Sequence, residues 1–172
     1  PLLILLIGGF VLMVTVSGPD RSGITATLTG VLVKHGADVV DIEQASLQNQ
    51  LGLYFLLDLS RAETGEDSVI KDLLFEASKL QLTLNFRLFS EGEVRVVSAR
   101  NLFVLTHFGS TQGLYEFSKI LGEERVNIET ISTVTHHGET SMEMVINVNE
   151  APNLGRLKER IMLMSRNLGI DL

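Results

Sequence analysis

The residues best suited to binding a small ligand lie in one glycine-rich loop, S-G-P-D-R-S-G at residues 17–23, immediately before a helical pattern. Backbone N–H groups and the positive end of a helix dipole point into such a loop, so it can hold a carboxylate or a phosphate. Gly18 and Gly23 would let a ligand approach the backbone closely. The alternative is ordinary turn chemistry, in which Asp20 or Ser22 caps the helix and the glycines fit a tight corner.

Patterns for other chemistry are absent or weak. The chain has no Cys, no two glycines spaced i, i+2 and no Gly-Lys-Ser/Thr, so neither a thiolate site nor nucleotide binding is supported. His136, His137 and Glu139 lie at a predicted hairpin turn, where neighbouring strand residues point to opposite faces, so we expect a solvated turn rather than a metal site. His35, before Gly36, is expected to interact with the C-terminus of its helix rather than act as a base. We predict no catalytic residue, metal or cofactor in this chain.

Composition narrows the class of protein. The 172 residues carry a net charge of −7 and are 45% hydrophobic, which is enough to fill a packed core and excludes disorder. An acidic chain has no basic stripe for phosphates, so nucleic acid and membrane surfaces are not expected partners. The missing cysteines fit a reducing cytoplasm, the expected location.

The N-terminal residues 1–16 are nearly all apolar, but Gly8 and Gly9 interrupt them and the run is shorter than the roughly 20 residues that a membrane helix needs. No basic residue precedes them, as a signal peptide would require. We therefore predict an N-terminal extension at residues 1–9 followed by a strand.

The chain repeats itself once. When the sequence is shifted by 89 residues, the two halves fall into register. The matched pairs are Val31, Leu32, Asp38, Val39 and Ile42 with Ile120, Leu121, Asn127, Ile128 and Ile131, and then Leu53, Phe55, Leu57 and Leu59 with Met142, Met144, Ile146 and Val148.

Each half predicts the element order βαββαβ, which is the ferredoxin-like order. The hairpin is the clearest element, because Leu51, Leu53, Phe55, Leu57 and Leu59 recur with period two and so bury one face. The first half predicts a strand at 10–17, a helix from Ile24 that ends at Gly36, strands at 38–48 and 51–60, a helix near 67–80 and a strand near 82–89. The second half predicts a strand at 101–108, a helix from Gly113 to about Gly122, strands at 126–136 and 139–149, and a helix at 153–167. The predicted fold class is α+β: two ferredoxin-like βαββαβ units with antiparallel sheets and helices on one face.

The predicted domains are residues 10–89 and 101–172, joined by a linker at 90–100 whose apolar run Val94–Val97 can add a connecting strand. At an offset of 88, Leu168, Ile170 and Leu172 match Leu80, Leu82 and Leu84. The last strand of the second domain is therefore expected to be truncated, as in a fragment of a longer protein or a sheet whose edge another chain completes.

The stretches V-T-V-S-G-P-D-R-S-G-I-T-A at 14–26 and H-G-A-D-V-V-D-I-E at 35–43 resemble the ACT domain, whose common pattern is a D-R-x-G-I loop, a helix and a G-x-N/D-I start to the second strand. The resemblance covers residues 10–172. It is greatest to the tandem ACT region that precedes the catalytic domain in one group of bacterial phosphoserine phosphatases, enzymes of serine biosynthesis.

This resemblance implies a regulatory module that binds a small amino acid, with L-serine suggested, at the interface between two ACT units. The glycine loop and helix start would hold the carboxylate, and the N/D position of the second strand would lie opposite. The first-half positions are Gly18, Pro19, Asp20, Arg21, Ser22, Gly23, Ile24 and Asp38, and the second-half positions are Gly109, Ser110, Thr111, Gln112, Gly113 and Asn127. The second loop lacks the Asp-Arg pair, so the two sites are not expected to be equivalent. Asp38 could attract an α-ammonium that Asn127 would only hydrogen-bond.

The D-x-D-x-T motif of the phosphatases is absent, because no two aspartates are spaced by two. Any catalysis, and any magnesium, would belong to a separate phosphatase domain. Two alternatives remain: a stand-alone two-ACT regulator resembling the glycine cleavage repressor proteins, which act through protein partners, and a purely structural dimerisation module. In each case we expect a homodimer, formed through the ACT sheets or through swapped strands, because exposed sheet edges tend to pair.

Overall fold

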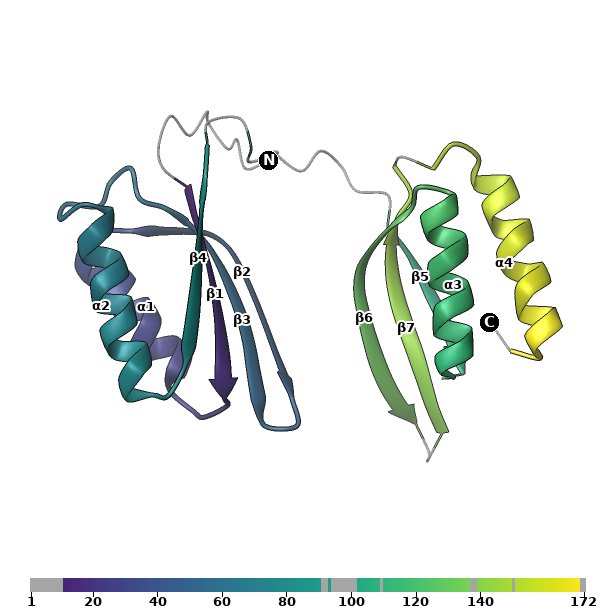
Figure 1. Ribbon diagram of the computed structural model, residues 1–172, viewed down its shortest axis with the longest axis horizontal. Coiled ribbons are helices and arrows are strands. Elements are labelled where there is room, and N and C mark those ends of the chain that lie inside the picture. The colour runs from purple at the N-terminus through teal and green to yellow at the C-terminus, as the bar shows by residue number, and fades with distance from the viewer. Residues whose placement is uncertain are drawn as a thin grey trace. The chain divides into compact units, whose positions relative to one another are not determined.

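The computed structural model describes residues 11–90, 93, 102–108, 110–136, 139–149 and 151–170. The chain divides into two compact units, residues 1–96 and 97–172 (Figure 1). The predicted extension at 1–9 and the predicted strand at Val94–Val97 lie outside the described residues. No helix in the described part of the chain has the length and apolar character needed to cross a bilayer.

The first unit is a four-stranded antiparallel sheet with two helices on one face (Figure 1). Its strand order is β2-β3-β1-β4, which is the ferredoxin-like arrangement expected from the sequence. The elements are β1 (Val11–Pro19), α1 (Ile24–His35), β2 (Asp38–Leu47), β3 (Gln50–Asp58), α2 (Glu66–Lys79) and β4 (Thr83–Phe89).

Alternation along the strands builds the first core. Every second residue of β3 is buried, as the period-two pattern predicts, and these side chains pack against the apolar stripe of α1. Helix α1 ends at Gly36, whose φ of +68° allows hydrogen bonds to the last carbonyls of the helix. The principal core residues are Val14, Val16, Leu28, Leu32, Leu53, Phe55, Leu57, Val69 and Leu73.

The second unit repeats this plan with its own core. Its described strands form a three-stranded antiparallel sheet in the order β5-β7-β6. The positions that correspond to β4 would begin at Asp171, outside the described residues. The elements are β5 (Leu102–Phe108), α3 (Thr111–Glu123), β6 (Asn127–His136), β7 (Glu139–Asn147) and α4 (Leu154–Leu168), and the core is built on Phe117, Leu121, Met144, Ile146 and Leu157.

His35 has different partners from the helix carbonyls expected from the sequence. Its ring is buried. Nδ1 is hydrogen-bonded to the Thr64 hydroxyl, and Nε2 lies 3.0 Å from Asp72 Oδ2. Lys34 Nζ lies 2.7 Å from the same oxygen. Hydrogen bonds from Lys34 first, and then from His35, lower the pKa of Asp72. The cluster ties α1 to α2, so its role is structural.

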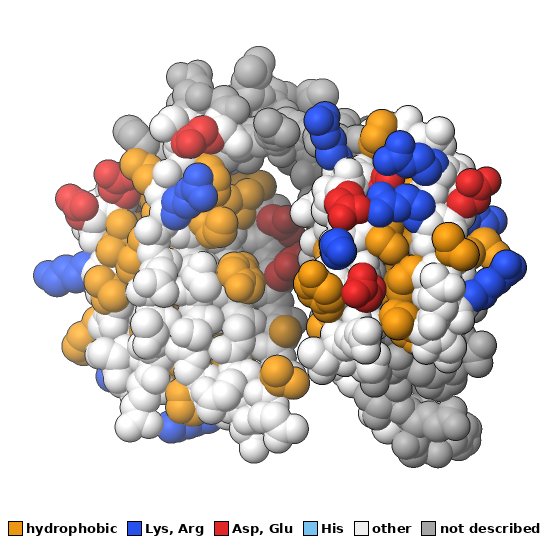
Figure 2. All heavy atoms as spheres, turned by 45° about the vertical axis from the view of Figure 1, so that its right-hand side comes forward, with side chains coloured by type: hydrophobic (Ala, Val, Ile, Leu, Met, Phe, Trp, Pro, Cys, Tyr) orange, Lys and Arg blue, Asp and Glu red, His pale blue; other side chains and the backbone are white. Residues whose placement is uncertain are grey.

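A buried carboxylate ties the helices of the second unit together. Glu124, 1% exposed, accepts hydrogen bonds from Arg156 and from Arg160 on α4, and Arg160 also pairs with Glu123. The hydrogen bond from Arg160 is the main cause of the lowered pKa of Glu124. Acidic and basic side chains are interspersed over this helical layer on the right-hand body of Figure 2.

Candidate functional site

The loop between β1 and α1 is held by its neighbours in the fold. The Asp20 N–H donates to the carbonyl of Asn49, in the β2–β3 turn, at 2.8 Å. Gly18 has a φ of +152°, and a Cβ there would lie 2.9 Å from Leu82 Cδ2 and 3.0 Å from the Gln81 carbonyl oxygen. Gly18 is therefore needed for packing against the two residues that precede β4.

The N-terminus of α1 has no side-chain cap. Its N-cap residue is Gly23, with a φ of +90°, and the first turn contains no acidic residue. The first helical hydrogen bond runs from the Thr27 N–H to the Gly23 carbonyl. The alternative in which Asp20 or Ser22 caps the helix is therefore wrong. Because the first N–H groups of a helix have no acceptor within it, the start of α1 is suited to an anion.

An open, polar hollow of about 440 Å³ lies at this helix start, within the volume range of small-ligand sites. Two side-chain hydrogen bonds border it: Arg21 Nη2 donates to Gln81 Oε1 at 2.9 Å, and the Thr25 hydroxyl donates to Gln44 Oε1 at 2.7 Å. The hollow is lined by Asp20, Arg21, Ser22, Gly23, Ile24, Thr25, Ala26, Gln44 and Asn49.

The hollow brings opposite charges to one place. The Arg21 guanidinium and the N–H groups at the start of α1 can donate to a carboxylate. Asp20 is another lining residue, and a carboxylate can accept from an ammonium group. A small zwitterion satisfies both, whereas a simple anion would leave Asp20 as a repulsive neighbour.

Of the predicted first-half residues, Asp20 to Ile24 come together at the hollow, while Gly18 and Pro19 do not line it. Asp38 lies at the far end of β2, since it pairs with Asp58 whereas Gln44 lies near the β2–β3 turn. Its carboxylate is 3.1 Å from Arg61, in an exposed ion pair. Within this unit, Asp38 and the loop therefore form no common site.

The corresponding helix start in the second unit is already satisfied. Ser110 is the N-cap of α3, and its hydroxyl accepts from the Gly113 N–H at 2.9 Å. Thr111 and Gln112 are exposed in the first turn, Asn127 is exposed at the start of β6, and Gly109 lies outside the described residues. The two loops therefore differ in more than the lost Asp-Arg pair, because one helix start is capped and the other is not.

Four lining residues were not predicted: Thr25, Ala26, Gln44 and Asn49. Thr25 and Ala26 follow directly from the helix start. Gln44 and Asn49 reach the hollow because β1 pairs with β3, with Pro19 opposite Gln50, which brings the β2–β3 turn to the same end of the sheet as the loop. The predicted βαββ order could therefore have indicated that the β2–β3 turn lies near the loop.

No group of three or more His, Asp or Glu able to hold an ion occurs in the described part of the chain. His137 and the side chains of His136 and Glu139 are outside that part.

Comparison with known proteins places the first unit in a family. Residues 11–87 match the ACT domain. A UPF0237 protein of Pyrobaculum aerophilum is 35% identical over 68 residues, which are 40% of this chain and 76% of that protein. A UPF0237 protein of Methanococcus maripaludis is 30% identical over 96 residues, which are 55% of this chain and 93% of that protein.

Solved structures share the fold over nearly the whole chain. A protein of unknown function from Galdieria sulphuraria has a TM-score of 0.74 at 19% identity, and a candidate glycine cleavage system transcriptional repressor has 0.69 at 16% identity. In both cases 94% of each chain is covered. At these identities the likeness shows the fold alone. The chain belongs to the UPF0237 family, and its first unit is an ACT domain.

Proposed function

We propose that this chain is a regulatory module that binds one small amino acid at the hollow between the β1–α1 loop and the β2–β3 turn, with L-serine as the first candidate. The observation that carries the proposal is the uncapped start of α1 facing a hollow that also contains Arg21 and Asp20. ACT domains are regulatory domains that commonly bind small ligands, and the match of residues 11–87 to this family supports the proposal.

The proposed pose follows from the charges. The ligand carboxylate accepts from the N–H groups of the first turn of α1 and from Arg21, and the ligand ammonium donates to Asp20. The hollow is polar and open, so a short side chain is accommodated without an apolar pocket. Asp38 enters the proposal only as a residue that a second ACT unit could contribute, as the family resemblance implies.

We propose one ligand per chain. The capping hydroxyl of Ser110 occupies the N–H group that a carboxylate would need at the start of α3. The second unit also has no counterpart of the Asp20–Arg21 pair.

The second candidate function is that of a stand-alone regulator, and the two-unit architecture favours it. The candidate glycine cleavage repressor has the same two-unit fold over 94% of both chains. The compared proteins give no support to the expected link with phosphoserine phosphatases, so the proposal does not include that enzyme.

The proposal is tested by calorimetric titration of the full chain with L-serine, glycine and L-alanine. A helix-start site for one zwitterion predicts a Kd in the micromolar to millimolar range, roughly −8 to −4 kcal/mol, with one site per chain. Two blocked analogues provide the control: serinamide lacks the carboxylate and N-acetylserine lacks the ammonium, and each is expected to bind at least tenfold more weakly. A folded chain that binds none of the three amino acids would contradict the proposal and favour a purely structural module.

A further inference from the structure

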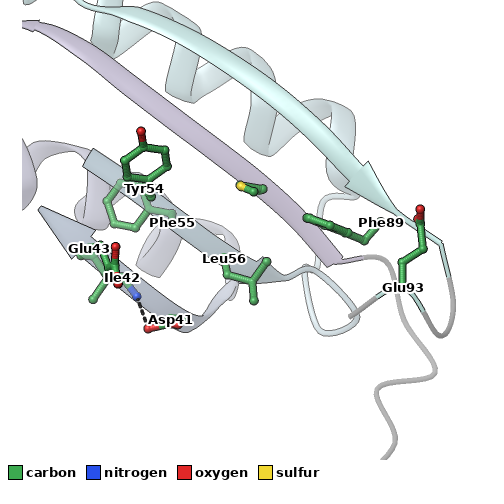
Figure 3. A pocket seen from close by; sticks show the side chains of 9 residues that line it. Asp41, Ile42, Glu43, Tyr54, Phe55, Leu56, Phe89 and Glu93 are labelled. Atoms are coloured by element: carbon green, nitrogen blue, oxygen red, sulfur yellow. Dashed lines mark hydrogen bonds between the residues drawn. The ribbon is translucent and has the colours of Figure 1, made fainter. Parts of the chain in front are cut away.

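The face of the first sheet that the helices leave open carries apolar side chains between charged ones. Tyr54, half of whose surface is exposed, projects from the middle of this face, and Leu56 and Phe89 lie on it nearby (Figure 3). Their hollow has a volume of about 350 Å³. The open-face side chains that line it are those of Met13, Asp41, Glu43, Tyr54, Leu56 and Phe89, and Glu93, just beyond the end of β4, also lines it.

Strand register arranges these residues in rows. Asp41 pairs with Leu56, Leu56 with Met13, and Met13 with Arg87, so one row crosses the sheet from β2 to β4. Directly paired residues share a face. This is the open face, because the next row along contains the core residues Phe55 and Val14. The row therefore has an acid at one edge, two apolar side chains in its middle and a base at the other edge.

The neighbouring open-face row has the same polarity. Glu43 pairs with Tyr54, Tyr54 with Thr15, and Thr15 with Asn85. A carboxylate again lies on β2, and a side chain able to donate lies on β4. In Figure 2 this face is on the left-hand body, where hydrophobic side chains lie among basic and acidic groups.

We propose that this open face packs against the same face of a second copy of the chain, about a two-fold axis parallel to the strands. Such an axis exchanges the two edges of the sheet while leaving the position along the strands unchanged. Asp41 of each copy then faces Arg87 of the other, Leu56 faces Met13, and Glu43 faces Asn85. The two rows are self-complementary in charge, as an isologous contact requires.

The geometry tolerates the usual angle between packed sheets. Strands about 4.8 Å apart put β2 and β4 roughly 14 Å apart. A rotation of about 30° between aligned sheets moves each edge by roughly 4 Å, which a long arginine side chain spans. The Arg87 guanidinium lies 4.9 Å from the centre of the Phe89 ring, so it is held on this face beside the apolar patch.

The size of the face predicts a weak dimer. Four strands of about seven residues cover roughly 19 by 23 Å, a flat footprint of roughly 440 Å² per copy. That area lies at the low end for specific interfaces, so the contact is expected to form in the micromolar range and to depend on its charges.

The test is sedimentation equilibrium of the full chain between about 1 and 300 µM. The wild type is expected to dimerise. Asp41→Arg and Arg87→Asp are each expected to raise the dimer Kd roughly ten- to hundredfold, because each pair occurs twice about the axis. The double variant D41R/R87D restores opposite charges and is expected to regain affinity to within about threefold of the wild type.

Lys71→Glu and Glu63→Arg are the matched controls, because they reverse exposed charges on the helical side of the same unit and should leave the dimer Kd unchanged. Asp41→Asn and Arg87→Gln serve if a reversal disturbs folding, and each is expected to weaken the dimer less than the reversal does. A wild type that stays monomeric at 300 µM, or a double variant no better than the single ones, would overturn the proposal. Equal losses from the controls would also overturn it.

Discussion

Arg21 provides the sharpest prediction for the ligand site. A hydrogen bond between charged partners contributes about 1.5–3 kcal/mol. Arg21 already donates to the neutral acceptor Gln81 Oε1 at 2.9 Å in an exposed hydrogen bond, and giving up that bond on binding costs about 1 kcal/mol. The net contribution is therefore about 0.5–2 kcal/mol, and Arg21→Gln is expected to weaken L-serine binding roughly two- to thirtyfold.

The assay is calorimetric titration of the wild type and of Arg21→Gln with L-serine at constant pH and ionic strength. Gln81→Ala is the matched control, because it removes the resting partner of Arg21 but no proposed ligand contact. Its Kd should equal that of the wild type or be up to about fivefold tighter. The reasoning is refuted if Arg21→Gln binds L-serine within twofold of the wild type, or if Gln81→Ala weakens binding as much as Arg21→Gln does.

Three further predictions concern stability. Gly18→Ala is expected to lower the free energy of unfolding by about 1–3 kcal/mol, because its Cβ would meet the Gln81 carbonyl at 3.0 Å. Gly23→Ala, also at positive φ but with no atom within 4 Å, should cost only backbone strain, about 1 kcal/mol, and urea unfolding compares the two. The lowered pKa of Asp72 stabilises the fold above its unfolded value near 3.8, and this stabilisation is lost as pH falls through the folded value. Melting curves between pH 6 and 2.5 should therefore show a shallower acid decline for Asp72→Asn than for the wild type. Phe117→Ala, which empties a fully buried position in the second core, should cost about 3–5 kcal/mol yet leave L-serine affinity unchanged. A loss of L-serine affinity in the folded Phe117→Ala variant would argue against a site confined to the first unit.

The sequence was most informative where periodicity was strong. Alternation from Leu51 to Leu59 predicted β3 and its buried face, and Gly36 predicted the end of α1, because a left-handed residue closes a helix. The repeat predicted the second unit, since the same order of periods recurs. These features are local, so they can be read from neighbouring residues alone.

Tertiary context decided the features that sequence reasoning missed. The packing of Gly18 against Gln81 and Leu82, which precede β4 and lie over sixty residues away, could not be predicted from the loop alone. His35 was expected to interact with its own helix end, but its ring hydrogen-bonds Thr64 and Asp72, and Asp72 lies on α2. The absence of a cap at Gly23 was also not predicted, because Asp20 and Ser22 are both good capping residues by type and only the backbone shows that neither one caps.

The central claim is that a small amino acid binds at the start of α1 and not at the start of α3. The most direct measurement is an NMR titration of the ¹⁵N-labelled chain with L-serine, following the backbone amide of each residue. The account predicts saturable shifts at Ile24, Thr25 and Ala26, with smaller ones at Gln44 and Asn49, and unchanged amides at Thr111 and Gly113. Shifts centred on the start of α3, or no shift at the start of α1 at saturating L-serine, glycine and L-alanine, would contradict it.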